Sequence, residues 1–182
     1  MEIHATSTIR HPRERVFRAY RDELPKIAAY MPNVRQVVIE RREEGAGWLK
    51  LHNVWTGKGE IPKVFRSVVN PDILVWDDFA TWHEADSFCE WRIGLRVFNE
   101  KFKCSGTNHI RAEGANTRVE LRGDLQIDLR DIPGVPRLLA GTLRPQIEAF
   151  IVRMIRPNLE ETNVALGRYL DAKPLSSSGE PA

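Results

Sequence analysis

The residues of this chain that could carry chemistry are concentrated in one stretch, VWDDFATWHEADSFCEWRIG, which spans residues 75–94. Three of the five tryptophans, Trp76, Trp82 and Trp91, stand here among several acidic residues. A carboxyl group held among aromatic side chains can carry a proton near neutral pH, because burial disfavours its charged form. Which of these acids faces the tryptophans depends on how the surrounding strands pair.

The sequence from residue 73 onward predicts a meander of four strands joined by short turns. The alternation of apolar and polar residues places them at about 73–84, 87–97, 101–112 and 116–129. Two-residue loops are expected at 85–86, 99–100 and 114–115, and these loops set the strand register by counting. The count gives four rows on one face: Trp82, Cys89, Ile110 and Val119; Ala80, Trp91, Asn108 and Leu121; Asp78, Ile93, Gly106 and Gly123; Trp76, Leu95, Cys104 and Leu125.

Asp78 is the acid that this count places on the apolar face. Burying an ionised carboxylate without partners costs several kcal/mol, so Asp78 must be hydrogen-bonded, protonated, or exposed to water or ligand inside a cavity. One interpretation is that Asp78 orients a ligand in an aromatic pocket, together with Asn108. The other is that Asp78 only bonds a buried indole N–H or the backbone. Asn53 joins this group if the preceding hairpin has an odd-numbered loop.

The elements around this meander are also readable. Residues 3–10 alternate as a strand, and helical patterns follow, interrupted at Pro25 and closed at Pro32. Two further strands are expected at 34–43 and 48–57, joined by the loop EGAG. The adjacent Gly106 and Gly123 predict a sharp sheet bend or a close approach of a helix.

The C-terminal part, residues 135–170, has a helical pattern. An unbroken helix of this length would run roughly 50 Å, against roughly 35 Å for an eleven-residue strand, so a break is expected near Pro145. Residues 171–182 are polar and are expected to form a disordered tail. Residues 59–72 predict a short amphipathic helix, which would be a lid, a membrane-touching segment, or a helix packed on the sheet edge.

This order of elements resembles the START-like helix-grip superfamily, also called SRPBCC, and in particular its polyketide cyclase/dehydrase and lipid-transport group. The resemblance is carried by IHATSTIRHPRERVFRAYRD, MPNVRQVVIERRE, LVWDDFATW, RVELRGDLQID and PQIEAFIVRMIRPNLEETNVALGRYL. It implies an α+β helix-grip domain over residues 1–170, with a curved seven-stranded antiparallel sheet around a long C-terminal helix and two short helices between strands one and two. It also implies a cavity between sheet and helix. Candidate ligand-binding residues are Trp55, Trp76, Asp78, Trp82, Trp91, Ile93, Asn108, Leu143, Ile147, Ile151 and Met154.

Several function classes are disfavoured by composition. The 27 basic and 25 acidic residues give a formal charge of +2, which does not indicate the strongly basic surface of a nucleic-acid-binding protein. No P-loop, dinucleotide fingerprint, nucleophile elbow or metal-spaced cluster occurs, so no cofactor and no metal are expected. Cys89 and Cys104 are expected to be buried free thiols. No apolar run is long enough to span a membrane, and a cytoplasmic setting is expected.

Three functions remain open, and the first is favoured. It is a non-enzymatic carrier or sensor of a hydrophobic small molecule such as a lipid, quinone or polyketide. The second is a cyclase, aromatase or dehydratase in which Asp78 moves protons and Asn108 polarises a carbonyl. The third is a quinone chaperone or partner-regulating domain. Its docking patch would be the outer basic cluster, Arg92, Arg96, Lys101 and Lys103.

Overall fold

The computed structural model describes residues 2–59, 74–96, 102–127 and 137–173. Both the expected amphipathic segment at 59–72, apart from its first residue, and the expected tail beyond residue 173 lie outside this part. The elements are β1 (Glu2–Ile9), α1 (Arg13–Asp22), α2 (Leu24–Ile27), the 3-10 turn η1 (Ala28–Tyr30), β2 (Val34–Gly45), β3 (Trp48–Gly57), β4 (Val75–His83), β5 (Phe88–Leu95), β6 (Phe102–Glu113), β7 (Asn116–Ile127) and α3 (Arg137–Ala172).

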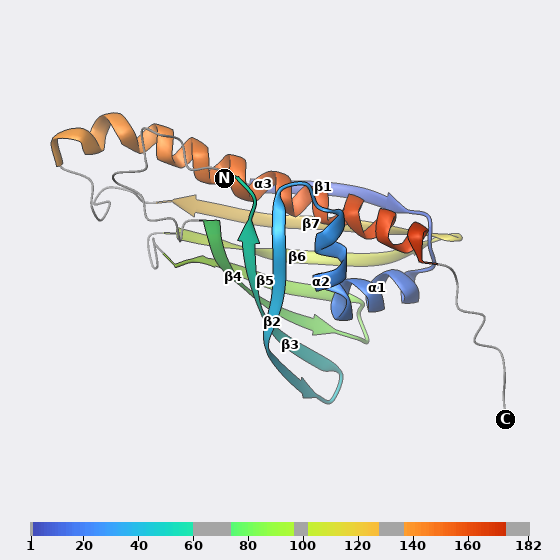
Figure 1. Cartoon of the computed structure of the whole chain (residues 1–182). Helices are drawn as coiled ribbons and strands as arrows, with labels where there is room; N and C mark the ends of the chain where they lie inside the picture. Colours follow the sequence, from blue (N-terminus) through green and yellow to red (C-terminus); the bar gives the residue numbers. More distant parts are fainter. Residues whose placement is uncertain (1, 60–73, 97–101, 128–136, 174–182) are drawn as a thin grey trace, which may run out of the picture.

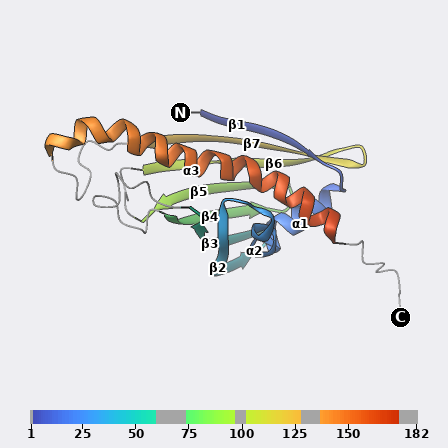
Figure 2. The ribbon, with the colours of Figure 1, turned by 45° about the horizontal axis from the view of Figure 1, so that its top comes forward.

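The strands form one seven-stranded antiparallel sheet in the order β1-β7-β6-β5-β4-β3-β2. The long helix α3 lies along one face of this sheet, and α1 and α2 lie near its C-terminal, red end (Figures 1 and 2). We call the face toward α3 the inner face. The predicted helix-grip fold is confirmed, including the two short helices between the first two strands.

The short helices owe their limits to proline and to apolar spacing. Pro12 precedes α1, whose buried side is made by Val16, Phe17, Ala19 and Tyr20. Pro25 stands in the first turn of α2, where its missing N–H costs no helical hydrogen bond. The chain therefore turns from α1 into α2 without leaving the inner face.

The predicted register is confirmed for two of the three hairpins and is wrong for the third. Trp82 pairs with Cys89 and Ile110 with Val119, as the two-residue loops require. Between β5 and β6, however, Trp91 pairs with Gly106 and not with Asn108, a slip of two residues. The slip keeps every side chain on its predicted face, because the side-chain period of a strand is two.

The two glycines explain why this register is preferred. A Cβ atom at Gly106 would stand 2.5 Å from the Trp91 ring, and one at Gly123 would stand 2.7 Å from it. The predicted helix approach at these glycines is wrong, since it is the Trp91 indole that occupies the space. The alternative, a sharp sheet bend, stays a prediction. Asn108 opposite Trp91 would have left the ring no such room.

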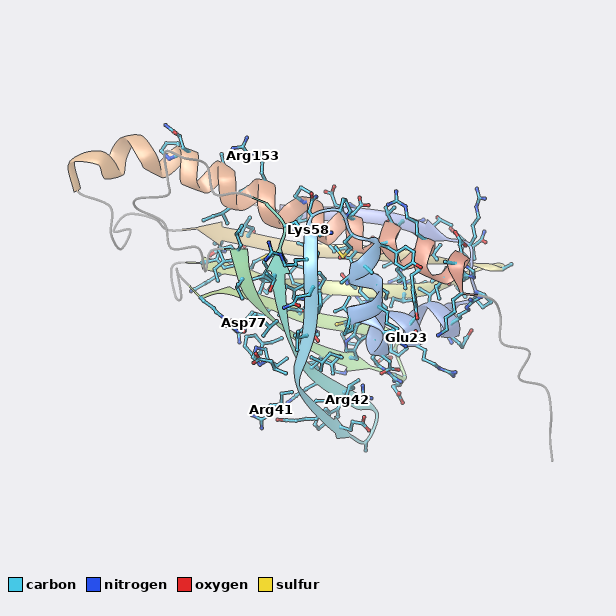
Figure 3. The ribbon with its side chains drawn as sticks, viewed as in Figure 1. Glu23, Arg41, Arg42, Lys58, Asp77 and Arg153 are labelled. Carbon is cyan, nitrogen blue, oxygen red and sulfur yellow. The ribbon has the colours of Figure 1, made fainter. Side chains whose placement is uncertain are left out.

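The β2–β3 hairpin has a two-residue turn, because Gly45 pairs with Trp48. The condition set for Asn53, an odd-numbered loop, is thus not met. Asn53 nevertheless lies directly opposite Asp78, because the β3–β4 pairing decides its face. The pairing of β2 with β3 shifts register at an irregularity between Ile39 and Arg41, and this shift compensates for the even-numbered turn. This hairpin extends beyond the other strands, with Arg41 and Arg42 along it (Figure 3).

The long helix is continuous, so the predicted break near Pro145 is wrong. α3 contains both Pro145 and Pro157 and extends to Ala172, two residues into the expected tail. Its length is accommodated because its N-terminal part projects past the strand ends (Figures 1 and 2). No helix in the described ranges has the length and apolar character needed to cross a bilayer.

The C-terminal half of α3 is anchored to the short helices. Arg15 donates to the carbonyl of Leu170 at 3.0 Å, and Lys173 contacts the Glu23 carboxylate at 2.9 Å. Tyr169 also donates to Glu23, which lies near this end of α3 (Figure 3). Leu166 is fully buried. This end of the helix is therefore fixed to the segment that contains the short helices.

Candidate ligand-binding site

A cavity of about 60 Å³ lies between the inner face of the sheet and the helices. One water molecule needs about 10–15 Å³ by such a measure, so the space holds several water-sized volumes. Its wall comes from four neighbouring strands and from all three α-helices. The lining residues are Tyr20, Leu24, Asn53, Trp55, Trp76, Asp78, Ala80, Trp82, Cys89, Trp91, Ile93, Asn108, Asn158, Leu159 and Thr162.

Most of the predicted binding residues meet in this wall. The seven on strands are Trp55, Trp76, Asp78, Trp82, Trp91, Ile93 and Asn108. Ile151 is fully buried in the core and is not part of the lining. The side chains of Leu143, Ile147 and Met154 lie outside the described part of α3. Contact of any of these residues with a ligand stays a prediction.

The helical side of the wall was largely missed. Tyr20 and Leu24 belong to the apolar stripe of the short helices, and their spacing alone did not distinguish core from cavity. Asn158 and Thr162 are buried polar residues four positions apart on α3. Polar residues repeated on the buried face of a helix were the available signal, since they share one face at this spacing.

Two adjacent aspartates on β4 have opposite electrostatic environments. Asp77 points to the outer face, where the Arg96 guanidinium binds it at 3.0 Å and His52 at 2.8 Å, and these partners lower its pKa. Asp78 points into the cavity, and burial raises its pKa to about 6. Asp78 is partly buried and is one of the residues that line the cavity. Asp78 is therefore the carboxyl group that can change protonation near neutral pH.

Asp78 is also hydrogen-bonded, and one of its donors is a buried indole N–H, as the second interpretation expected; orientation of a ligand by Asp78 stays a prediction. Asn53 Nδ2 donates to Asp78 Oδ2 at 3.0 Å, and Trp55 Nε1 donates to the same oxygen at 3.3 Å. These two donors oppose the effect of burial on the Asp78 pKa. Because a carboxylate only accepts, the Asn53 amide must present its nitrogen to Asp78. Its oxygen, Oδ1, is buried and has no partner in the described part of the chain.

A second polar group in the wall is fully connected. Trp91 Nε1 donates to Asn108 Oδ1 at 3.1 Å, and Asn108 Nδ2 donates to the Tyr20 hydroxyl at 3.1 Å. An indole N–H can only donate, so this orientation of the Asn108 amide is required. Burial raises the pKa of Tyr20, which keeps its hydroxyl protonated. Trp82 packs edge-on against Tyr20 and Phe17 at the same end of the cavity.

The cysteines behave as predicted. Cys89 and Cys104 are free and buried, and burial raises the pKa of both thiols, that of Cys104 to about 12. Neither is a thiolate at neutral pH, so neither is a ready nucleophile. Within the described ranges, no group of three or more His, Cys, Asp or Glu side chains could hold a metal ion.

The outer basic cluster is partly neutralised within the sheet surface. Arg96 is paired with Asp77, and the Arg92 guanidinium lies 4.4 Å from the centre of the Phe79 ring. Lys103 is exposed, and Lys101 lies outside the described residues. Docking of a membrane or a protein partner at this surface stays a prediction.

Comparison with known proteins establishes the fold. No protein-family model and no curated protein sequence matches this chain. Solved structures do match over nearly its whole length. The protein TTHA0849 from Thermus thermophilus has a TM-score of 0.63 and 21% identity, with 96% of this chain and 100% of that chain covered.

Two further structures are similar at lower identity. The Zhui aromatase/cyclase from a Streptomyces species, strain R1128, has a TM-score of 0.61 and 19% identity, covering 97% of this chain and 98% of its own. Ara h 8.0201 has a TM-score of 0.54 and 12% identity, covering 95% and 99%. The structural neighbours are START-like helix-grip proteins of the SRPBCC superfamily, and this chain shares their fold.

Proposed function

We propose that this helix-grip protein binds a hydrophobic small molecule in the cavity between its sheet and α3, as a carrier or sensor. The observation that carries the proposal is the composition of the described wall. Four tryptophans line the space together with the carboxyl group of Asp78 and the Asn53 amide oxygen, which has no partner among the described residues. Apolar walls with a few placed polar groups are typical of small-molecule sites. In a core packed without a ligand cavity, buried hydrogen-bond acceptors are normally paired.

The size of the cavity bears on the ligand. Sites for drug-sized ligands are typically about 300 Å³ or more. At 60 Å³ the cavity is smaller than the roughly 150 Å³ of a cavity that holds benzene, so a ligand with a ring must displace side chains of the wall. We therefore expect single-ring ligands to bind with side-chain movement, and larger ligands to require a larger rearrangement.

Native mass spectrometry of the freshly purified protein tests this proposal. We expect a non-covalent mass that denaturing extraction releases, or uptake of a single-ring compound such as 4-ethyltoluene when the protein is isolated empty. The variant Ala80→Phe fills the cavity from the inner face and should abolish binding, whereas Thr81→Phe on the opposite face of β4 should not. A protein that carries nothing and takes up nothing would contradict the proposal.

A second candidate, a cyclase or dehydratase-type enzyme, is favoured by the raised pKa of Asp78. A carboxyl group with a pKa of about 6, open to an aromatic cavity, can donate and accept a proton near neutral pH. In this role Asp78 would exchange a proton with the bound molecule, and Asn53 and Trp55 would hold the carboxyl group in place. One structural neighbour is an aromatase/cyclase.

The two candidates separate on one substitution. With a synthetic linear poly-β-keto thioester as substrate, an enzyme should form a cyclised or dehydrated product that mass spectrometry detects. Asp78→Asn should abolish that product while the protein still takes up 4-ethyltoluene. A wild-type protein that binds the thioester and returns it unchanged would support the carrier function.

A further inference from the structure

Two neighbouring polar groups of the cavity wall have acceptor oxygens without donors. Asn53 is 1% exposed, and its Oδ1 has no donor in the described part of the chain. From the described residues Asp78 receives hydrogen bonds on Oδ2 alone, which leaves Oδ1 without a donor in that part of the chain. The two residues are directly opposite each other on β3 and β4. We call this pair the acceptor pair.

An unpartnered donor also lies in the wall, but it is distant. The indole Nε1–H of Trp82 has no acceptor among the described residues. Trp82 stands four residues from Asp78 along β4, which corresponds to about 13 Å along a strand. A single small head group that contacts the acceptor pair therefore does not reach Trp82.

Asp78 gives the cavity a negative charge, and the described part of the wall supplies no matching cation. No Lys, Arg or His side chain is among the described residues that line the cavity. His52, which acts electrostatically on Asp78, lies on the outer face and is engaged with Asp77. An anionic ligand would thus meet a like charge in a poorly solvated space, which is strongly unfavourable.

We propose that the ligand carries a hydrogen-bond-donating head group, a hydroxyl or an amine, that binds the acceptor pair Asn53 and Asp78, and that the cavity rejects carboxylates. This inference rests on the proposed function and narrows it. A hydroxyl or ammonium group supplies the donors that Asn53 Oδ1 and Asp78 Oδ1 lack. The tryptophan walls accept the apolar body and also favour a cation. Free fatty acids and other hydrophobic carboxylates are excluded.

Four probes with the same apolar body test this inference at pH 8. They are 4-ethyltoluene, 4-ethylbenzyl alcohol, 4-ethylbenzylamine and 4-ethylbenzoate, which differ only in the group para to the ethyl chain. Binding is followed by the five indole N–H signals in ¹H–¹⁵N spectra, with Trp55 assigned from Trp55→Phe. The alcohol or the amine should bind up to about tenfold tighter than 4-ethyltoluene, the value of one good hydrogen bond. 4-Ethylbenzoate should bind most weakly.

Variants locate the effect and distinguish the two head groups. Asn53→Leu should remove the advantage of the alcohol over 4-ethyltoluene. Asp78→Asn should reduce the advantage of the amine more than that of the alcohol, and should weaken the rejection of 4-ethylbenzoate. The matched control is Asp77→Asn, which removes the neighbouring charge on the outer face and should change none of these ratios.

Failure of the inference and failure of the proposed function would give different binding results. If 4-ethyltoluene binds as tightly as both donor probes, or if 4-ethylbenzoate binds as well as they do, the inference is overturned and the cavity remains a binding site. The same holds if the preferences persist in Asn53→Leu and Asp78→Asn. If none of the four probes changes any indole signal, the proposed function falls and the inference falls with it.

Discussion

Two asparagines on the inner face, Asn108 and Asn53, occupy similar places but have different hydrogen-bond environments. Asn108 accepts from Trp91 and donates to Tyr20, so both ends of its amide are used. Asn53 donates to Asp78, and its oxygen is left without a donor among the described residues. The first network is neutral and complete. The second is charged and incomplete, and this difference separates a structural polar network from one that can receive a ligand.

The surroundings of the two networks reinforce the contrast. The Trp91 indole of the first lies over Gly106 and Gly123, where no side chain fits. The carboxyl group of the second borders the cavity, and its donors among the described residues both come from β3. The closed network should therefore respond to substitutions through stability, and the open network through pH and ligand binding.

The largest expected effect is a loss of stability around the network of Trp91, Asn108 and Tyr20. In Gly106→Ala the new Cβ atom would lie 2.1 Å from the backbone carbonyl oxygen of Arg122 and 2.5 Å from the Trp91 ring. Backbone cannot move aside as a side chain can, so we expect a loss of about 3 kcal/mol or more in the free energy of unfolding. Urea unfolding measures it. Gly94→Ala, on β5 with open space at its Cβ position, is the control and should cost little.

An effect of similar size on the free energy of unfolding is expected in the network of Asn53 and Asp78, but it appears as a dependence of stability on pH. The pKa of Asp78 rises from 3.8 to about 6 in the fold because burial penalises its charge. The folded state holds this proton more tightly than the unfolded state, so stability falls as pH rises from about 4 to 6 and stays lower above. Asp78→Asn removes this loss. Its stability relative to the wild type should rise by up to about 3 kcal/mol between pH 4 and pH 8.

The neighbouring aspartate provides the control for this titration. The pKa of Asp77 is lowered by its hydrogen bonds to Arg96 and His52, so its contribution is present above about pH 4 and is lost only at lower pH. Asp77→Asn should therefore show no such rise between pH 4 and pH 8. An equal pH dependence in the two variants would show that Asp78 is not penalised by burial.

The inner face of the sheet was predictable because strand periodicity is robust. Asp78, Asn108 and the three tryptophans of residues 75–94 were placed on that face by counting alone, and the placement survived a two-residue error between β5 and β6. Only an error of an odd number of residues would have reversed the faces. The error itself arose at the β5–β6 connection, where the sequence Asn99-Glu100 contains no glycine to specify a turn type. The fit of Trp91 over two glycines decides the pairing.

The helical wall was less predictable because it depends on how α3 lies across the sheet. Its apolar stripe is compatible with many positions, and the prolines suggested a break that the helix does not have. Asn158 and Thr162 enter the wall because Tyr169 and Lys173 fix the far end of the helix to Glu23. Such long-range anchoring has no local sequence signal, so the cavity could be inferred but its boundary could not.

The smallest expected effect tests whether the closed network is independent of the charged one. Tyr20→Phe leaves the buried Asn108 Nδ2 without an acceptor and should lower the free energy of unfolding by about 1–2 kcal/mol. This loss should be the same at pH 5 and pH 8, because neither Tyr20, Asn108 nor Trp91 changes charge in that range. Tyr30→Phe, at an exposed ring, is the control and should have little effect. A loss that differs between the two pH values would mean that Tyr20 interacts with Asp78 strongly enough for the two regions to act as one site.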